Sequence, residues 1–233
     1  MRDTRVRIST SRDLDLAPVW SPDGRRLAYR SGAWGSSNLS IASADGTGVL
    51  RVLRCPGEPC LPTDWSPDGQ FLLINAQGDV WTVPVGGEEP AQPLLDAGSM
   101  QRDARISPDG RSVSYVSHES GRPEVYVQNV TGAPDRVLVS RGGAQPVWSR
   151  RGRELFYVNL DNELHRVAIG TDRNDRVIVE PPAKLPIPTF APGHLGTSYD
   201  VSPDASRVYF PHPGTPSKPR EVRFALDWAA RLK

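Results

Sequence analysis

The phrase Ser-Pro-Asp-Gly recurs along this chain at nearly even intervals. It is intact at three places and altered at two, where Ser-Arg-Arg-Gly and Ser-Pro-Asp-Ala stand instead. The five copies begin at Ser21, Ser66, Ser107, Ser149 and Ser202, which lie 45, 41, 42 and 53 residues apart. Repeats of about 40 to 45 residues that contain short strands are typical of β-propeller blades. The repeat therefore predicts an all-β chain built of such blades.

Each copy of the phrase is expected to form a turn between two strands. Proline presets φ at the second turn position, aspartate tolerates the third, and glycine supplies a positive φ. The structural turn positions are Asp23, Gly24, Asp68, Gly69, Asp109 and Gly110. Aspartate in such a turn hydrogen-bonds its own backbone, so these carboxylates and that of Asp204 are interpreted as turn residues and not as ligands.

Four strands are predicted in the first repeat, at 17–20, 26–30, 38–42 and 49–53, and the other repeats superpose on this scheme. Alternating polarity in the second of these strands is typical of a half-buried strand. Residues 1–226 are thus predicted to form a propeller of about five four-stranded blades. The blades are expected near 17–53, 62–95, 103–139, 145–179 and 197–226.

The last blade lacks an outer strand in the sequence. Residues 4–8 are expected to supply it by pairing with 222–226, which would close the ring and remove exposed sheet edges. The alternative is an incomplete ring, cut from a longer parent that holds more blades. Residues 227–233 are expected to form a helical tail, because the apolar residues at its start and along it share one helical face, namely Leu226, Trp228, Ala229 and Leu232. A helix this short is marginal alone, which favours its docking on the propeller.

Composition argues against two kinds of partner. The formal net charge is +1 with both signs interspersed, whereas nucleic-acid binders usually show a concentrated basic face. The densest basic group, Arg150, Arg151 and Arg153, lies at a predicted hairpin tip and is interpreted as a solvated turn. No apolar run is long enough to span a bilayer. We therefore expect no nucleic-acid partner and no membrane insertion.

The compartment stays open. Residues 1–5 carry charge without a following apolar stretch, which is unlike a secretory signal. A cytoplasmic location is expected for the chain as encoded, and an extracytoplasmic one if it belongs to a membrane-anchored parent. Cys55 and Cys60 frame a short loop, and two ligands are too few for a structural zinc site. A loop disulfide and a pair of free thiols both fit this spacing.

Several phrases match a known family. Trp-Ser-Pro-Asp-Gly followed by an apolar strand resembles the TolB-type, WD-repeat-like β-propeller repeats. More closely, the chain resembles the C-terminal propeller of bacterial proteins that join a eukaryotic-like serine/threonine kinase to such repeats. The matching phrases are 18–24, 64–69, 117–122, 124–127 and 154–157, with 225–228 and 232–233 at the end. Arg150-Arg151 in place of Pro-Asp, and Ala205 in place of Gly, depart from the pattern and are expected to weaken their turns.

The resemblance implies a sensing or interaction propeller with a protein or peptide partner. Nothing in the chain resembles a kinase glycine-rich loop, catalytic loop or magnesium-binding motif. Kinase activity is therefore not assigned to these residues, and any such activity would lie in another domain.

One position on the predicted inner strands suggests a site. The residue just before the tryptophan register is Val19, Asp64, Arg105, Val147 or Asp200 in successive repeats. Asp64 and Arg105 belong to neighbouring blades, so they are predicted to form an inter-blade ion pair near the axis. Asp200 has no cationic counterpart at that register and is hypothesised to help hold a cation or polar ligand at the channel mouth. These three residues are the candidates for ligand or partner binding.

Other conspicuous residues receive structural interpretations. Trp20, Trp65 and Trp148 share one register and are expected to pack between blades. The four histidines, at 118, 165, 194 and 212, fall in different layers of different blades, so they predict no catalytic or metal site. The proline-rich insert 180–196 is expected to be a rigid loop across one face, and is a second candidate contact surface.

The hydrolase elbow Gly-x-Ser-x-Gly and the phosphate-binding Gly-x-x-x-x-Gly-Lys are both absent from the sequence. We predict a non-catalytic, monomeric propeller module for protein or ligand recognition, without cofactor or metal, as the C-terminal part of a larger signalling protein. The rival hypothesis is a propeller hydrolase or lyase with acidic residues at the channel mouth. A third is an orphaned gene fragment with no independent role.

Overall fold

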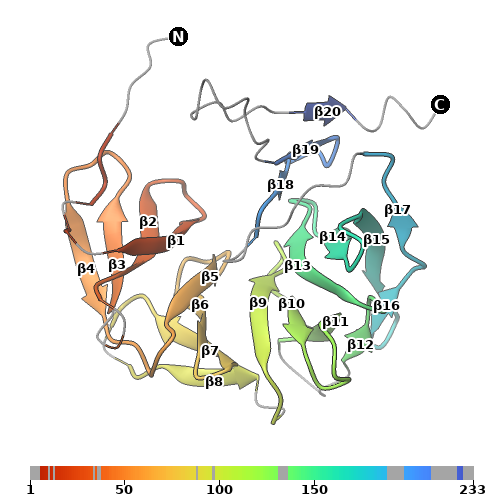
Figure 1. The fold of residues 1–233 in the computed structure, drawn as a ribbon, viewed down its shortest axis with the longest axis horizontal. Helices are drawn as coiled ribbons and strands as arrows, with labels where there is room; N and C mark the ends of the chain where they lie inside the picture. Colours follow the sequence, from red (N-terminus) through yellow and green to blue (C-terminus); the bar gives the residue numbers. More distant parts are fainter. Residues whose placement is uncertain are drawn as a thin grey trace. The chain divides into compact units, whose positions relative to one another are not determined.

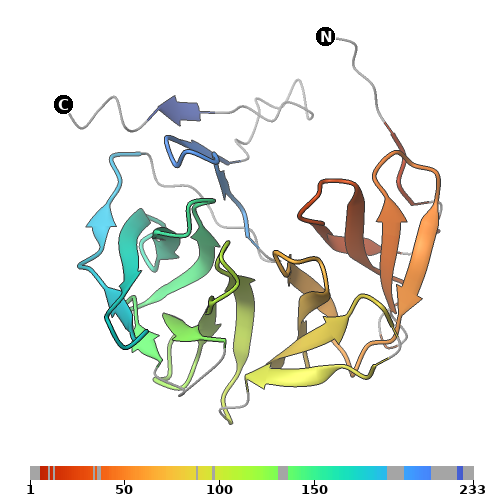
Figure 2. The ribbon, with the colours of Figure 1, turned by 180° about the vertical axis from the view of Figure 1, so that it is seen from behind.

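A computed structural model describes residues 6–9, 11–12, 14–33, 35, 38–87, 89–95, 98–130, 136–187, 197–210 and 225–227. They form antiparallel β-sheets whose strands follow one another in chain order (Figures 1 and 2). The chain divides into two compact units, Met1–Ala104 and Arg105–Lys233. The described part contains no helix with the length and apolarity to cross a bilayer. The predicted all-β class is confirmed, whereas the number of blades and the closure of a ring stay predictions.

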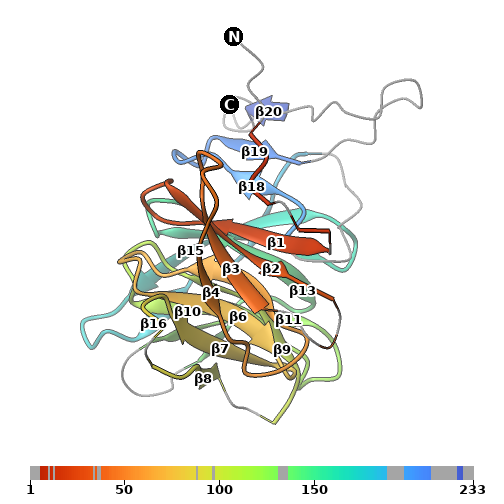
Figure 3. The ribbon, with the colours of Figure 1, turned by 90° about the vertical axis from the view of Figure 1, so that its left-hand side faces the viewer.

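The first unit contains two four-stranded sheets. The first sheet, at the front of Figure 3, consists of β1 (Asp15–Trp20), β2 (Arg26–Ser31), β3 (Asn38–Ser43) and β4 (Val49–Leu53). The second sheet consists of β5 (Leu61–Trp65), β6 (Phe71–Ala76), β7 (Asp79–Pro84) and β8 (Gln92–Leu95). Val19, Ala28 and Ile41 lie opposite one another on β1 to β3 and pack with Leu72 and Ile74 into one buried cluster. This cluster is the apolar core of the first unit.

The second unit contains the remaining sheets, and its boundary falls inside β9. The third sheet consists of β9 (Gln101–Ile106), β10 (Ser112–Ser117), β11 (Glu124–Asn129) and β12 (Val137–Leu138). The fourth consists of β13 (Gly143–Trp148), β14 (Glu154–Asn159), β15 (Leu164–Thr171), β16 (Val177–Val179) and β17 (Ala183–Lys184). The last described sheet consists of β18 (Asp200–Val201), β19 (Arg207–Tyr209) and β20 (Ala225–Asp227). Two buried clusters join the third sheet to the fourth and the fourth to the last.

The outer edge of the fourth sheet is shared by two short strands. β16 pairs with the end of β15 from Ile169 onward, and β17 pairs with His165 and Arg166 nearer its start. Leu185, just after β17, is only 2% exposed and packs in the core. The prediction of a loop over 180–196 is therefore wrong for its first part. β15 is too long for the three residues of β16, and its remaining backbone groups need partners. Residues 188–196 lie outside the described residues.

The three tryptophans of the shared register differ in burial. Trp65 and Trp148 are 4% and 9% exposed, as expected for packing between sheets, whereas Trp20 is 59% exposed. Within the first unit, Trp65 faces the sheet that precedes it, where the Arg26 guanidinium lies 5.0 Å from the indole centre. Trp20 lies on the first sheet, which no described sheet of that unit precedes. The predicted packing is thus wrong for Trp20.

The chain ends differ from the prediction where they are described. Val6, Arg7 and Ile8 are not in a strand, and the first two lie against the β3–β4 turn. A Cβ built on Gly46 in that turn would lie 2.5 Å from Val6 Cγ1. β20 extends to Asp227, which pairs with Arg207 of β19, so the predicted helical register from Leu226 is wrong at its start. Residues 4–5, 222–224 and 228–233 lie outside the described residues, so pairing of the two ends stays a prediction.

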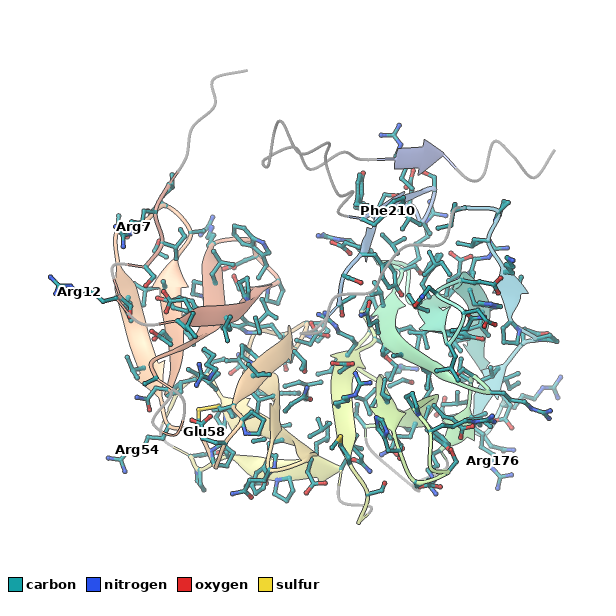
Figure 4. All side chains as sticks on the ribbon, viewed as in Figure 1. Arg7, Arg12, Arg54, Glu58, Arg176 and Phe210 are labelled. Carbon is teal, nitrogen blue, oxygen red and sulfur yellow. A yellow bond between two sulfur atoms is a disulfide. The ribbon has the colours of Figure 1, made fainter. Side chains whose placement is uncertain are left out.

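Cys55 and Cys60 form a disulfide in the loop between β4 and β5. Glu58 lies within that loop, beside the yellow sulfur bond in Figure 4. Its carboxylate lies 3.8 Å from the guanidinium of Arg30, a fully buried side chain. Gln77 Nε2 donates a hydrogen bond to the Pro56 carbonyl at 3.1 Å. The disulfide therefore belongs to a loop that is tied to both sheets of the first unit.

Candidate functional site: the inner-strand ends

The predicted site residues lie near the ends of inner strands, the first strand of each sheet. Asp64 is in β5, Arg105 in β9 and Asp200 in β18. Both aspartates accept a hydrogen bond from the next N–H, from Trp65 at 2.9 Å and from Val201 at 2.7 Å. Asp64 is half-buried and Asp200 is exposed. The backbone thus fixes the direction of both carboxylates.

Arg105 connects the three inner strands of the second unit. Its guanidinium is half-buried, and Nη2 donates a hydrogen bond to Thr197 Oγ1 at 2.9 Å, just before β18. Its carbonyl accepts one from Trp148 Nε1 of β13 at 3.2 Å. The side chain and backbone of Arg105 are therefore both held by neighbouring sheets.

A β-bulge at Gln145 completes this connection. The register of β13 shifts between Ala144 and Val147, and Gln145 has φ of +58°, which few residues other than glycine adopt. Bulges re-aim side chains locally. Here Gln145 Oε1 accepts hydrogen bonds from Ser198 N at 3.1 Å and Ser198 Oγ at 2.8 Å. The Gln145 carbonyl accepts one from the Tyr199 hydroxyl at 2.8 Å.

Tyr199 is a buried residue that immediately precedes Asp200. The residue is 6% exposed, and burial raises the pKa of its hydroxyl well above 10, while the Arg105 cation lowers it and the Asp200 anion raises it. Both charges therefore lie within electrostatic reach of one buried ring. In the second unit, Arg105 hydrogen-bonds to Thr197 in the segment that leads into β18, and Asp200 is the first residue of that strand. Asp64 belongs to the first unit, so its pairing with Arg105 stays a prediction.

Sequence reasoning missed four members of this group: Gln145, Thr197, Ser198 and Tyr199. The only signal for the last three is a polar run that leads into an inner strand. Gln145 gives no signal of its own, because a bulge depends on how two strands pair.

The arrangement can bind charged and polar groups. It offers a guanidinium and an exposed carboxylate at the ends of two inner strands, while hydrogen bonds between Gln145, Ser198 and Tyr199 hold the segment before β18 in place. Among the described residues, no group of three or more His, Cys, Asp or Glu is arranged to hold a metal ion. His165 instead stacks on Tyr157, with ring centres 5.3 Å apart, and His194 and His212 lie outside the described residues. The geometry fits recognition of a ligand that carries charge.

The repeated turns lie directly after the inner strands. Ser107 Oγ donates a hydrogen bond to Asp109 Oδ1 at 2.5 Å and accepts one from Ser112 N at 2.9 Å. Asp23 and Asp68 accept the same hydroxyl hydrogen bond in their turns. Gly24, Gly69 and Gly110 have φ of +68°, +73° and +75°. The carboxylates of these turns are therefore engaged locally.

The repeated antiparallel sheets, together with the polar side chains at the ends of their inner strands, place the chain in the class of repeat β-propellers. The model of the TolB beta propeller domain family matches residues 3–210. The chain belongs to this family.

Two curated proteins are similar in sequence to parts of this chain. The Tricorn protease homolog 1 of Streptomyces coelicolor is 34% identical over 92 residues, which cover 38% of this chain and 8% of that protein. The Tol-Pal system protein TolB of Bordetella pertussis is 28% identical over 125 residues, or 52% of this chain and 28% of that one. The chain thus spans less than half the length of these relatives.

Solved structures share the fold. TolB from Acinetobacter baumannii matches with a TM-score of 0.62 and 22% identity, over 86% of this chain and 49% of that one. The Cps50 (Swd1) β-propeller domain of Myceliophteria thermophila matches with a TM-score of 0.61 and 15% identity, over 88% and 64%. The resemblance to TolB-type and WD-repeat-like propellers is confirmed, and the kinase association stays a prediction.

Proposed function

We propose that the chain is a recognition module that binds a protein or peptide segment at its inner-strand ends. The observation that supports this proposal is that two opposite charges are each held in place close to buried Tyr199, Arg105 by its hydrogen bond to Thr197 and Asp200 by the Val201 N–H. Groups held by a rigid scaffold bind without paying much ordering entropy. A peptide offers both signs of charge as well as backbone amides, so it matches this set of groups. Asp64 is proposed to add a second carboxylate.

The relatives support a role in assembly. One of them is named a component of the Tol-Pal system, and TolB-like propellers mediate protein interactions. We propose that this chain likewise acts through a protein partner, as a monomer and without a cofactor. Light scattering on the purified chain tests the monomer.

A peptide-display selection on the immobilised chain tests the recognition site. We expect enriched peptides to bind the wild type and to bind Arg105→Gln and Asp200→Asn about tenfold more weakly, since central charged contacts carry much of the binding energy. The matched controls are Arg173→Gln and Asp161→Asn, which change exposed residues of other loops. Equal binding by all four variants, each with an unchanged melting temperature, would refute the site.

We further propose that the chain does no catalysis itself. TolB-like and WD-repeat-like propellers are generally not enzymes, which supports this reading over the hydrolase or lyase. Calorimetric titration with Zn²⁺ and Mn²⁺ separates the two, because tight stoichiometric binding lost in Asp64→Asn and Asp200→Asn would favour the enzyme. The resemblance to kinase-linked propellers supports a place in a larger signalling protein, and the genomic reading frame upstream tests it.

A further inference from the structure

The turn after β13 keeps its shape although its sequence departs from the repeat. Arg150 and Arg151 stand where the intact phrase has Pro-Asp. Gly152 N still donates to the Ser149 carbonyl at 2.9 Å, and Ser149 N to the Glu154 carbonyl at 2.9 Å. The φ of Gly152 is +69°, close to that of the intact turns. The two arginines are therefore presented on an ordered turn.

The departure leaves a polar group unsatisfied. Ser149 is 1% exposed, and its buried hydroxyl has no hydrogen-bond partner in the described structure. In the neighbouring turn the equivalent hydroxyl, that of Ser107, donates a hydrogen bond to Asp109. A buried hydroxyl without a partner is unfavourable. The two arginines therefore do not stabilise this turn as proline and aspartate stabilise the intact ones. A position that breaks a local rule without local compensation is where function is expected.

The positive charge at this place is concentrated. Arg150, Arg151 and Arg153 are exposed, and so is Arg111 of the preceding turn. A Cβ on Gly152 would lie 3.5 Å from Pro108 Cδ, so the two turns are adjacent. We name these four arginines the basic turn patch. None of them forms an ion pair with another residue of the described part of the chain. The charge of this patch is thus available to a partner.

Nearby carboxylates have other partners. Asp109 accepts from the Ser107 hydroxyl and from Arg111 N. Glu154 pairs with Arg166 across the sheet at 3.1 Å. Neither is used to neutralise the guanidinium groups of the basic turn patch.

We propose that the basic turn patch is an interaction surface for an acidic peptide segment, one with clustered Asp or Glu. A guanidinium matches a carboxylate with two parallel hydrogen bonds. A nucleic acid fits less well, because the chain carries a net charge of only +1 and a pI of 7.8, and nucleic-acid domains are usually far more basic. The proposal goes beyond recognition at Arg105 and Asp200 and does not depend on it.

Fluorescence anisotropy with a short labelled oligo-glutamate peptide tests the proposal. We expect the wild type to bind, and to bind more weakly as salt is raised. Arg150→Gln with Arg151→Gln should weaken binding roughly five- to thirtyfold, the sum of two exposed ion pairs. The matched control Arg173→Asp makes the same change in net charge on another loop and should stay within about twofold.

A second variant separates folding from binding. Arg150→Pro with Arg151→Asp restores the intact phrase, so it should fold at least as stably as the wild type and yet lose the peptide. Equal weakening by the control, no binding by the wild type, or equally tight binding of a DNA oligonucleotide would each overturn the proposal. The last outcome would indicate a general polyanion surface.

Discussion

A serine and the aspartate two residues later hold each intact turn together. In the second repeat, Ser66 Oγ donates to Asp68 Oδ1 at 2.6 Å and accepts from Phe71 N at 3.0 Å. The hydroxyl and the Gln70 N–H lower the pKa of Asp68. The same pair occurs with Asp204, although alanine replaces the glycine there and takes φ of +57°. These contacts are local, which is why the sequence pattern predicts them.

Arg151→Asp should stabilise the protein. It gives the buried Ser149 hydroxyl an acceptor, and a net gain of about 1 kcal/mol is expected for one such hydrogen bond. Urea denaturation measures the change in the free energy of unfolding. Arg153→Asp makes the same charge change without reaching that hydroxyl. An equal effect of both substitutions would show that charge, and not the hydrogen bond, is responsible.

Acid should weaken the turns in a defined range. Hydrogen bonds from Ser202 Oγ, Ser206 N and Ser206 Oγ lower the pKa of Asp204 to about 2. The folded pKa is thus below the unfolded value, so this stabilisation is complete above about pH 4. It is lost as pH falls through about 2. Ser202→Ala should raise the pKa of Asp204 in an NMR titration of the carboxyl carbon, and an unchanged pKa would refute the assignment.

At the scale of the sheets, two tryptophans in one register should contribute different amounts to the free energy of unfolding. Trp65→Ala removes a side chain from the core between two sheets and should cost about 3–5 kcal/mol. Trp20→Ala removes a largely exposed ring and should cost less than about 1 kcal/mol. Equilibrium denaturation compares the two variants. Similar costs would mean that the face of the first sheet with Trp20 is covered in solution.

The disulfide loop should stabilise the first unit. Joining Cys55 to Cys60 closes a loop of six residues, for which chain entropy predicts a loss of about 2 kcal/mol when the bond is removed. The double variant Cys55→Ser with Cys60→Ser should show this loss in guanidinium denaturation, and a reductant should affect only the wild type. A reductant effect of equal size on the double variant would contradict the role of the disulfide.

The sequence predicts the elements better than it predicts their partners. The turns and most strands follow from local patterns, whereas β17 completes an edge that only the pairing of β15 defines. The bulge at Gln145 likewise arises between two strands. The apolar spacing after Leu226 fits both a helix and the end of a strand. The pairing of Asp227 with Arg207 of β19 shows that Asp227 belongs to a strand. Arg105 and Asp200 are candidates from the sequence alone because they occupy a repeated register.

At the scale of the whole molecule, cooperativity tests closure. The pairing of the two chain ends that the sequence predicts would join the chain into one folding unit, although Val6, Arg7 and Ile8 are not in a strand. With such closure, calorimetry should show a single transition with equal calorimetric and van't Hoff enthalpies. Deleting residues 1–8 should lower the melting temperature and broaden the transition. Two separate transitions in the intact chain would contradict the closure and would show that the two units unfold independently.

The outer margin of the fourth sheet has a consequence for solubility. Pro181 and Pro182 precede β17 and Pro186 follows it, and none of them carries an amide hydrogen. A fibril grows by adding copies along an unbroken row of such donors. The prolines on both sides of β17 interrupt the row of donors at this edge, which disfavours the addition of further strands there.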